Sequence, residues 1–353
     1  MKPMSLKGTG IHASEHIPSP QSPSGDTPTQ SGLRPVPPAL ILKEIADMWY
    51  FARQTGIDKD LKALHRPRLS RSLLLAAGDW VLIAFATAAT IAFGWAAVPF
   101  SLLVIGNRQR ALGNILHDAS HRSFSGHRRR AAILANLLFC WPLWVSMAIY
   151  RNEHNRHHRF LGDPARDPDF IHDETRLSRG WVSVWLDQIL SPRMFRISLL
   201  SHLTRMDAGT LTGVVCWWTA ALSLIAFATS AADALIFLAL WVAARATAFH
   251  VITSFREISD HVGLPPGGLI GFSRNHPFSS VAGQIFHPHN NGYHLLHHLM
   301  PGLPFHAMPR AHALLLAWPP YATGEQCDSY FMGINSAVRS WVRRWEPGAA
   351  ASG

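Results

Sequence analysis

The sequence predicts an all-α integral membrane protein whose four transmembrane helices form two hairpins. Hydrophobic residues make up 48% of its 353 residues and charged residues only 15%, a balance typical of membrane proteins. Its long apolar runs come in two pairs, each joined by a short turn. The net charge of +10 comes from basic residues beside these runs, which indicates positive-inside loops and excludes a nucleic-acid-binding surface.

The first residues of the chain have a composition that is unsuited to a packed core. Residues 1–40 are rich in Pro, Ser, Gly and Thr and hold no apolar h-region, so we expect a disordered N-terminal tail and not a cleaved signal peptide. Residues 41–72 form a juxtamembrane segment in which Ile41, Ile45 and Met48 recur at helical spacing. This helix could lie along the membrane surface or be cytosolic.

The first predicted hairpin joins the apolar runs 74–93 and 95–116. The second run carries Asn107, Arg108 and Arg110, so these side chains face the bundle interior or the helix has already left the hydrocarbon. A helix of about 26 residues is about 39 Å long, which exceeds the hydrocarbon core of about 30 Å. We therefore expect its C-terminal end to project into the cytosol.

The second predicted hairpin joins runs 209–229 and 232–255. Neither hairpin turn contains Lys or Arg, so both turns should face away from the cytoplasm and the basic loops should face it. We expect the membrane to be a bacterial inner membrane. The apolar stretch 131–150 is interrupted by Trp141 and Pro142. We expect it to be re-entrant or interfacial, because a fifth span would place the segments around it on opposite sides. The last residues, 321–353, are predicted to form a cytosolic tail.

Histidines gather in three clusters, each just outside an apolar run. The clusters are His117 and His121; His154, His157 and His158; and His294, His297 and His298. Residues at i, i+3 and i+4 share one face of a helix, so each cluster can direct its imidazoles at one point. One such pair alone is more often solvated than metal-bound. Eight imidazoles exceed the four ligands of a structural zinc site, so two metal ions are predicted.

The three clusters and their surroundings resemble the histidine boxes of membrane fatty acid desaturases and their hydroxylase relatives. The matching stretches are HDASH at 117–121, EHNRHH at 153–158 and YHLLHHLMP at 293–301. The resemblance covers residues 75–315 and implies a membrane domain over 73–320, with a cytosolic helical cap that holds a non-haem di-iron site. It also implies a further ligand between the last span and the third box, where His261 stands.

The resemblance further implies the reaction and its participants. O₂ would serve as co-substrate, and the most favoured outcome is a double bond in a fatty acyl or lipid-like chain. A hydroxylase, ketolase or epoxidase acting through the same di-iron centre is the alternative. The chain has no His-Pro-Gly-Gly haem motif, so electrons should come from a separate ferredoxin-type or cytochrome b5-type donor with its reductase.

Ligating imidazoles usually donate their second N–H to an oxygen acceptor. Acidic and amide residues near the boxes are the candidates for this orienting role. They are Asp118, Asp167, Asp169, Asp260 and Asn290, together with Glu153 and Glu257. The remaining histidines lack box spacing, and for these we expect solvated loop positions: His127, His172, His287, His289, His306 and His312. His289 is the least certain of them, since its run with Asn290 could orient a ligand or a metal-bound water.

Two other classes of protein compete with this interpretation. A histidine-rich metal transporter would place its ligands at membrane depth and not at helix ends. A membrane zinc hydrolase would need a general-base Glu within an HExxH motif, which the sequence lacks.

Overall fold

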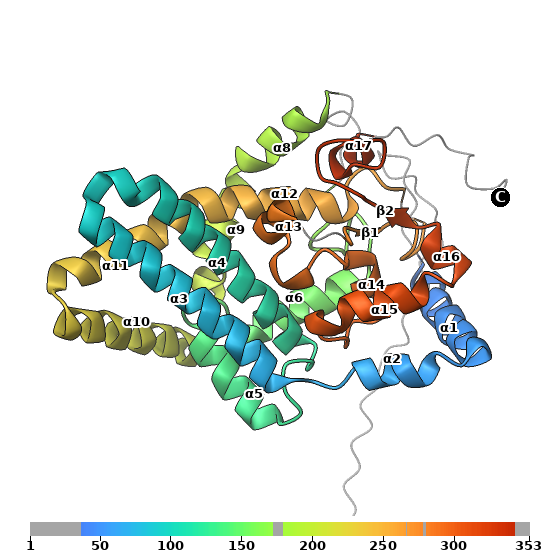
Figure 1. Ribbon diagram of the computed structural model, residues 1–353, viewed down its shortest axis with the longest axis horizontal. Coiled ribbons are helices and arrows are strands. Elements are labelled where there is room, and N and C mark those ends of the chain that lie inside the picture. Colours follow the sequence, from blue (N-terminus) through green and yellow to red (C-terminus); the bar gives the residue numbers. More distant parts are fainter. Residues whose placement is uncertain (1–36, 172–178, 266, 278–279, 343–353) are drawn as a thin grey trace, which may run out of the picture. The chain divides into compact units, whose positions relative to one another are not determined.

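A computed structural model describes residues 37–171, 179–265, 267–277 and 280–342, and this part of the chain is mostly helical. Its two longest hairpins are drawn in Figure 1, with the shorter helices around α14 and α15 beside them. The predicted tail up to residue 36, His172 and the last residues from 343 lie outside the described residues.

The first predicted hairpin is present as α3 (Leu69–Phe93), the turn η1 (Gly94–Ala97) and α4 (Val98–Ser120). Gly94 ends α3 at a positive φ of 62°, a backbone conformation that favours glycine. The two helices are antiparallel, because the Ser101 hydroxyl donates to the Ala86 carbonyl at 2.7 Å. The Thr90 hydroxyl donates to Ser101, also at 2.7 Å, and so reinforces this contact.

The second hairpin is formed by α10 (Ala208–Ala228) and α11 (Ala231–Ala244), with Asp207 and Ser230 as N-caps. The α11 helix continues through a π-helical turn, η4 (Arg245–Phe249), into α12 (His250–His261). A polar N-cap residue thus begins both α10 and α11. The continuous helix from α11 to α12 ends at His261.

Three helical stretches among the described residues are long and apolar enough to cross a membrane: Leu69–Ser120, Ala208–Ala228 and Ala231–His261. The first of them contains both arms of the α3–α4 hairpin. Large apolar side chains such as Phe93, Trp95 and Phe227 are at least 74% exposed, as expected for side chains that face lipid. The chain is therefore a membrane protein, and its four-span topology stays a prediction.

The interrupted stretch 131–150 contains no helix of spanning length. It begins within α5 (Arg128–Ala135), continues as the π-helical turn η2 (Asn136–Cys140), and turns at Trp141–Trp144 before α6 (Met147–Arg159). Trp144 has a φ of 58°, a left-handed conformation within this turn. The re-entrant or interfacial character of the stretch stays a prediction.

The remaining elements come before α3, between α6 and α10, and after α12. Helix α1 (Pro38–Thr55) begins inside the tail boundary predicted at residue 40, and it is followed by α2 (Asp58–Leu64). The others are α8 (Trp181–Ile189), α9 (Pro192–Leu200), η3 (Leu203–Arg205), α13 (Val281–Phe286), η5 (Pro288–Asn290), α14 (His294–Leu299), η6 (Phe305–Ala307), α15 (Met308–Leu315), α16 (Pro319–Ala322) and α17 (Ala337–Trp341). Strand β1 (Arg274–Asn275) pairs in parallel with β2 (Glu325–Gln326).

The predicted C-terminal tail is folded onto the protein up to residue 342. Tyr321 and Trp341 are fully buried, and the Trp341 ring lies 4.8 Å from that of Phe255 on α12. A free tail would leave these aromatic rings in water, at a cost that their burial avoids. The α17 segment therefore covers the helix that ends at His261.

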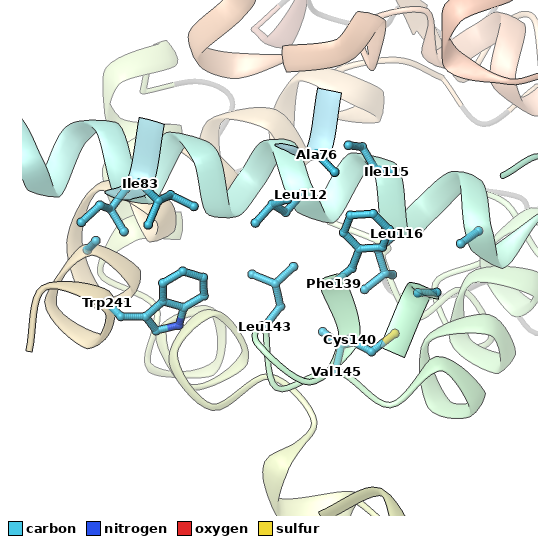
Figure 2. Close-up of a cluster of buried hydrophobic side chains, with 14 of the residues drawn as sticks. Ala76, Ile83, Leu112, Ile115, Leu116, Phe139, Cys140, Leu143, Val145 and Trp241 are labelled. Carbon is cyan, nitrogen blue, oxygen red and sulfur yellow. The ribbon is translucent and has the colours of Figure 1, made fainter. Parts of the chain in front are cut away.

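A core of buried apolar side chains holds the α3–α4 hairpin against the stretch around α5 and against α11. Figure 2 shows Leu112 and Ile115 on α4 near Phe139, and Trp241 farther along the cluster. The Gln109 side chain donates to the Trp241 carbonyl at 3.0 Å, which satisfies a polar group inside the bundle. Gln109 therefore faces the interior, as does Arg108, which pairs with Asp79 on α3. The position of these residues relative to the hydrocarbon stays a prediction.

Candidate metal centre

The three predicted clusters and His261 lie on four helices. The first cluster ends α4, the second lies on α6, His261 ends α12, and the third begins α14. Because each cluster occupies helical turns, its i, i+3 and i+4 imidazoles extend from one helix face, as the spacing predicts. The structure brings all nine histidines together.

A first group of four imidazoles draws on all three clusters. Its members are His117, His121, His154 and His297, and their ligand atoms lie within 4.8 Å of one another. The Nε2 atoms of His121 and His154 are 2.7 Å apart, and those of His117 and His297 are 3.1 Å apart. We call this set the first histidine group.

A second group contains the additional histidine at the end of α12. Its members are His157, His261, His294 and His298, again with ligand atoms within 4.8 Å. The Nε2 atom of His294 lies 2.8 Å from that of His261 and 2.9 Å from that of His298. We call this set the second histidine group, and it places His261 where the family resemblance predicts a ligand.

The ninth histidine, His158, lies between the two groups. Its Nε2 atom is 3.0 Å from that of His154 and 2.9 Å from that of His297. Its ring centroid is 4.5 Å from that of His298 in the second group. This position allows His158 to complete the ligand set of either ion.

The geometry fits two adjacent metal ions with nitrogen ligands. Two imidazole nitrogens bound at about 2.1 Å to one ion and at a right angle would lie about 3.0 Å apart, close to the separations of 2.7–3.1 Å found here. A site made only of imidazoles suits iron, zinc, copper or nickel. Nine ligands around two foci exceed a single tetrahedral zinc site.

Burial keeps most of these imidazoles neutral, with a lone pair available for a metal. It lowers the pKa far below the usual value for His154, His158, His294, His297 and His298. His157 differs: burial opposes its charge, but the hydrogen bond and negative charge of Asp167 outweigh burial and raise its pKa to about 9. The hydrogen bond to Asp167 holds a proton on Nδ1, so Nε2 is the nitrogen that would lose its proton and bind a metal in the second group.

The predicted orienting residues differ in how closely they reach the imidazoles. Asp167 accepts from His157 Nδ1 at 2.8 Å, and Asp169 lies 3.9 Å from the same atom. Asp260 lies 3.5 Å from His294 Nδ1. His261 Nδ1 instead donates to the Phe272 carbonyl at 2.6 Å, an acceptor that sequence reasoning missed because every residue has one.

The other predicted orienting residues have different neighbours. Asp118 lies 4.0 Å from His117 Nδ1 and accepts from the Phe305 backbone N–H at 2.9 Å. Asn290 donates to the Phe305 carbonyl at 3.2 Å, so both residues hold the η6 segment. Glu153 pairs with Arg205, and Glu257 pairs with Arg256.

The expectation of solvated loops was wrong for three histidines. His287 and His312 are buried, where each ring bonds a tyrosine hydroxyl. His289 Nε2 lies 2.8 Å from Asp79 on α3. Tyrosine hydroxyls supply the polar partners of the two buried rings, and a carboxylate supplies that of the partly buried His289. His127 is exposed, as expected.

Sequence reasoning also missed Tyr150, an aromatic residue at the site, and the buried His276 beside His287. The Tyr150 ring stacks on His154 with centroids 5.7 Å apart. His276 is buried and stacks on His287 at 4.7 Å. The Tyr150 position, one helical turn before His154, was a spacing signal that could have identified it.

A cavity of about 530 Å³ lies beside the histidines. Its wall includes Tyr150, which stacks on the first group, and Asp169, which lies near His157 of the second. Other parts of the wall come from α4, α8, α9, the η4–α12 helix and the segments around Leu143 and Phe170. None of the nine site histidines lines the cavity, and Tyr150 and Asp169 are the wall residues that connect it to the two histidine groups.

Comparison with known proteins identifies similar sequences. A family model described as "Fatty acid desaturase" matches residues 93–327. The chain is 27% identical over 291 residues to dihydrorhizobitoxine desaturase of Bradyrhizobium elkanii, a match that covers 77% of this chain and 82% of the relative. A Delta 8-(E)-sphingolipid desaturase of Lachancea kluyveri is 32% identical over 73 residues, which cover 21% of this chain and 13% of that protein.

Proposed function

This chain belongs to the fatty acid desaturase family, and from that premise we propose that it is an O₂-dependent membrane oxidoreductase with a non-haem di-iron centre. We further propose that it introduces a double bond into a fatty acyl or lipid-like chain. The two histidine groups, nine imidazoles joined through His158, are the observation that carries the proposal.

The proposed centre uses each histidine as a ligand. The first group would hold one iron, the second group would hold the other, and His158 would lie between them. Bound iron would supply the redox chemistry by which O₂ accepts electrons and hydrogen is taken from an unactivated carbon. Removal of two hydrogens from substrate, with two electrons and two protons from a donor, reduces O₂ to two waters. A ferredoxin-type or cytochrome b5-type protein with its reductase would supply those electrons.

The protein's own residues would orient the ligands and exclude water. Three groups would orient imidazoles through the ring nitrogen that faces away from the metal. They are Asp167 for His157, the Phe272 carbonyl for His261 and Asp260 for His294. Burial of the box histidines keeps bulk water from the reacting carbon. The cavity wall at Tyr150 and Asp169 would position that carbon, and placement decides between desaturation and oxygen insertion.

The proposed cellular arrangement follows from the charge pattern. The membrane domain over 73–320 would lie in a bacterial inner membrane with four spans and its histidine cap towards the cytoplasm. The described boxes lie at helix ends, whereas a transporter needs its ligands at membrane depth. The similar relatives of this chain are named as desaturases, which favours desaturation over the hydroxylase, ketolase and epoxidase alternatives.

Expression in a host that lacks the activity tests this proposal. The protein would be produced with a ferredoxin and its reductase, and cellular lipids would be profiled by mass spectrometry. A product lighter by two hydrogens supports desaturation. A product heavier by one oxygen with no new alkene would refute desaturation and leave the di-iron centre intact. The His297→Ala variant, which lacks an imidazole of the first group, is the inactive control.

A further inference from the structure

A buried arginine lines the cavity at a distance from the histidines. Arg245 begins the π-helical turn η4 and forms part of the cavity wall, and it is only 3% exposed. π-Helical turns are rare and are often found at functional sites. An ionisable residue within a membrane span is itself unusual, because desolvation of its charge is unfavourable.

The contacts of Arg245 leave its charge without a counter-ion. Its Nε donates to the Leu199 carbonyl at 3.2 Å, and the guanidinium lies over the rings of Trp144 and Phe249. Across the described ranges of the chain, no carboxylate lies within 4.0 Å of it, and its Nη1 has no hydrogen-bond partner. Hydrogen-bond donors are thus left unused at a cavity wall.

Other arginines of this protein show how a sheltered guanidinium is usually compensated. Arg256 bonds Asp260 at 2.7 Å and Glu257 at 2.8 Å, and Arg108 bonds Asp79 at 2.9 Å. Arg245 has one carbonyl and two aromatic rings instead. A planar guanidinium with free donors is suited to a carboxylate, which it can bind through two parallel hydrogen bonds.

The position of Arg245 defines the shape of such a ligand. Arg245 precedes His261 by sixteen residues on one continuous helix, which corresponds to about 24 Å along the axis. The same cavity wall contains apolar side chains such as Leu143, Val145 and Leu116, and it includes Tyr150, which stacks on His154. A molecule with its charged end at Arg245 and its apolar body along this wall would therefore extend towards the histidines.

We propose that Arg245 binds the carboxylate of the substrate, so that the cavity takes an elongated carboxylic acid with its apolar chain directed at the histidine groups. This assignment names a substrate class for the proposed function and rests on it. Arg110 and Arg193 also line the cavity. Arg193 is exposed to solvent, and the Nη2 of Arg110 donates to Asn291 at 3.3 Å, whereas Arg245 is buried with its terminal Nη1 unpartnered. We therefore assign Arg245 as the carboxylate anchor.

Equilibrium binding to purified full-length protein in a non-ionic detergent tests the anchor directly. The probes are dodecanoate, its uncharged methyl ester and dodecyl phosphate. Loss of a charge-assisted hydrogen-bond pair should weaken dodecanoate binding at least about tenfold in Arg245→Met, and binding of the ester should change less than about twofold. Arg245→Lys should retain part of the affinity. Arg196→Met, an exposed arginine on α9, is the matched control and should bind like the parent protein.

Several outcomes would overturn the assignment. Equal binding of acid and ester by the parent protein would exclude a carboxylate anchor, and tighter binding of the phosphate would assign another anion. A tenfold loss of dodecanoate affinity in Arg110→Met but not in Arg245→Met would assign the carboxylate to Arg110 instead. Iron content and elution on size exclusion are measured in every variant. Protein that binds dodecanoate through Arg245 but holds no iron would refute the di-iron function and keep the carboxylate site.

Discussion

The imidazole of His157 donates its Nδ1–H to Asp167 Oδ1 at 2.8 Å, and both side chains are only 2% exposed. The same carboxylate also accepts from the backbone N–H groups of Gly162 and Asp169, both at 2.9 Å. Asp167 therefore joins the loop after α6 to one imidazole of the second histidine group. This link makes a specific prediction for metal binding.

Asp167→Asn should weaken iron binding, because an orienting partner of a metal-bound histidine contributes about 10-fold to 100-fold to affinity. Iron retained after dialysis against a chelator series measures the effect. Asp169→Asn is the matched control, since Asp169 lies 3.9 Å from His157 and should contribute less. Iron retention equal to that of the parent protein in Asp167→Asn would show that His157 needs no carboxylate partner.

The close contact between α4 and η4 predicts opposite effects at two glycines. A Cβ at Gly106 would lie 2.6 Å from the Phe249 backbone nitrogen, whereas one at Gly113 would meet nothing within 4 Å. Gly106→Ala should therefore destabilise the bundle by about 1–3 kcal/mol through overpacking. Gly113→Ala should stabilise α4 by up to about 1 kcal/mol through helix propensity. Thermal unfolding in detergent compares them, and equal melting temperatures would refute the predicted contact.

The ion pair inside the α3–α4 hairpin predicts a strong stability effect. Asp79 is 2% exposed and bonds both Arg108 and His289. Asp79→Leu would leave the Arg108 charge uncompensated, at a cost of about 3–5 kcal/mol. Adding Arg108→Met should recover most of that loss, because both charges are then gone. Unfolding free energies in detergent test this, and a double variant no more stable than Asp79→Leu would show that the two charges are not coupled.

The proposed topology predicts which loops an impermeant thiol reagent can reach from outside the cell. Single cysteines would be placed in a Cys216→Ser background at Trp95, which is 89% exposed, and at Arg166, whose side chain is 50% exposed. Trp95→Cys should be labelled in intact cells and Arg166→Cys only after lysis. Labelling of Arg166→Cys in intact cells would place the loop after α6 outside and contradict the shared cytoplasmic site.

Periodicity explains why much of the site could be predicted. The box histidines recur at i, i+3 and i+4, so helix geometry alone aligns each set on one face. His261 has no such partner and was assigned only through the family resemblance. Its partner, the Phe272 carbonyl, carries no sequence signal, because every peptide group offers one.

Other features depend on long-range packing that spacing does not encode. The Asp79 charge in an apolar run has its partners on α4 and at the strained turn of His289, where φ is 58°. Trp341 lies 86 residues along the chain from its contact at Phe255, so the C-terminal segment was expected to be a tail. The π-helical turn Arg245–Phe249 contains no Gly or Pro that would mark a break in the helix, and only the structure reveals it.

Metal analysis of the purified full-length protein tests the central claim most directly. Elemental analysis combined with Mössbauer spectroscopy should find close to two irons per chain in adjacent nitrogen-rich sites. Alanine at His117, His157 or His297 should lower the iron content and abolish activity, because each removes an imidazole from one of the two groups. Stoichiometric zinc with activity retained, or a single iron that these variants leave in place, would contradict the di-iron account.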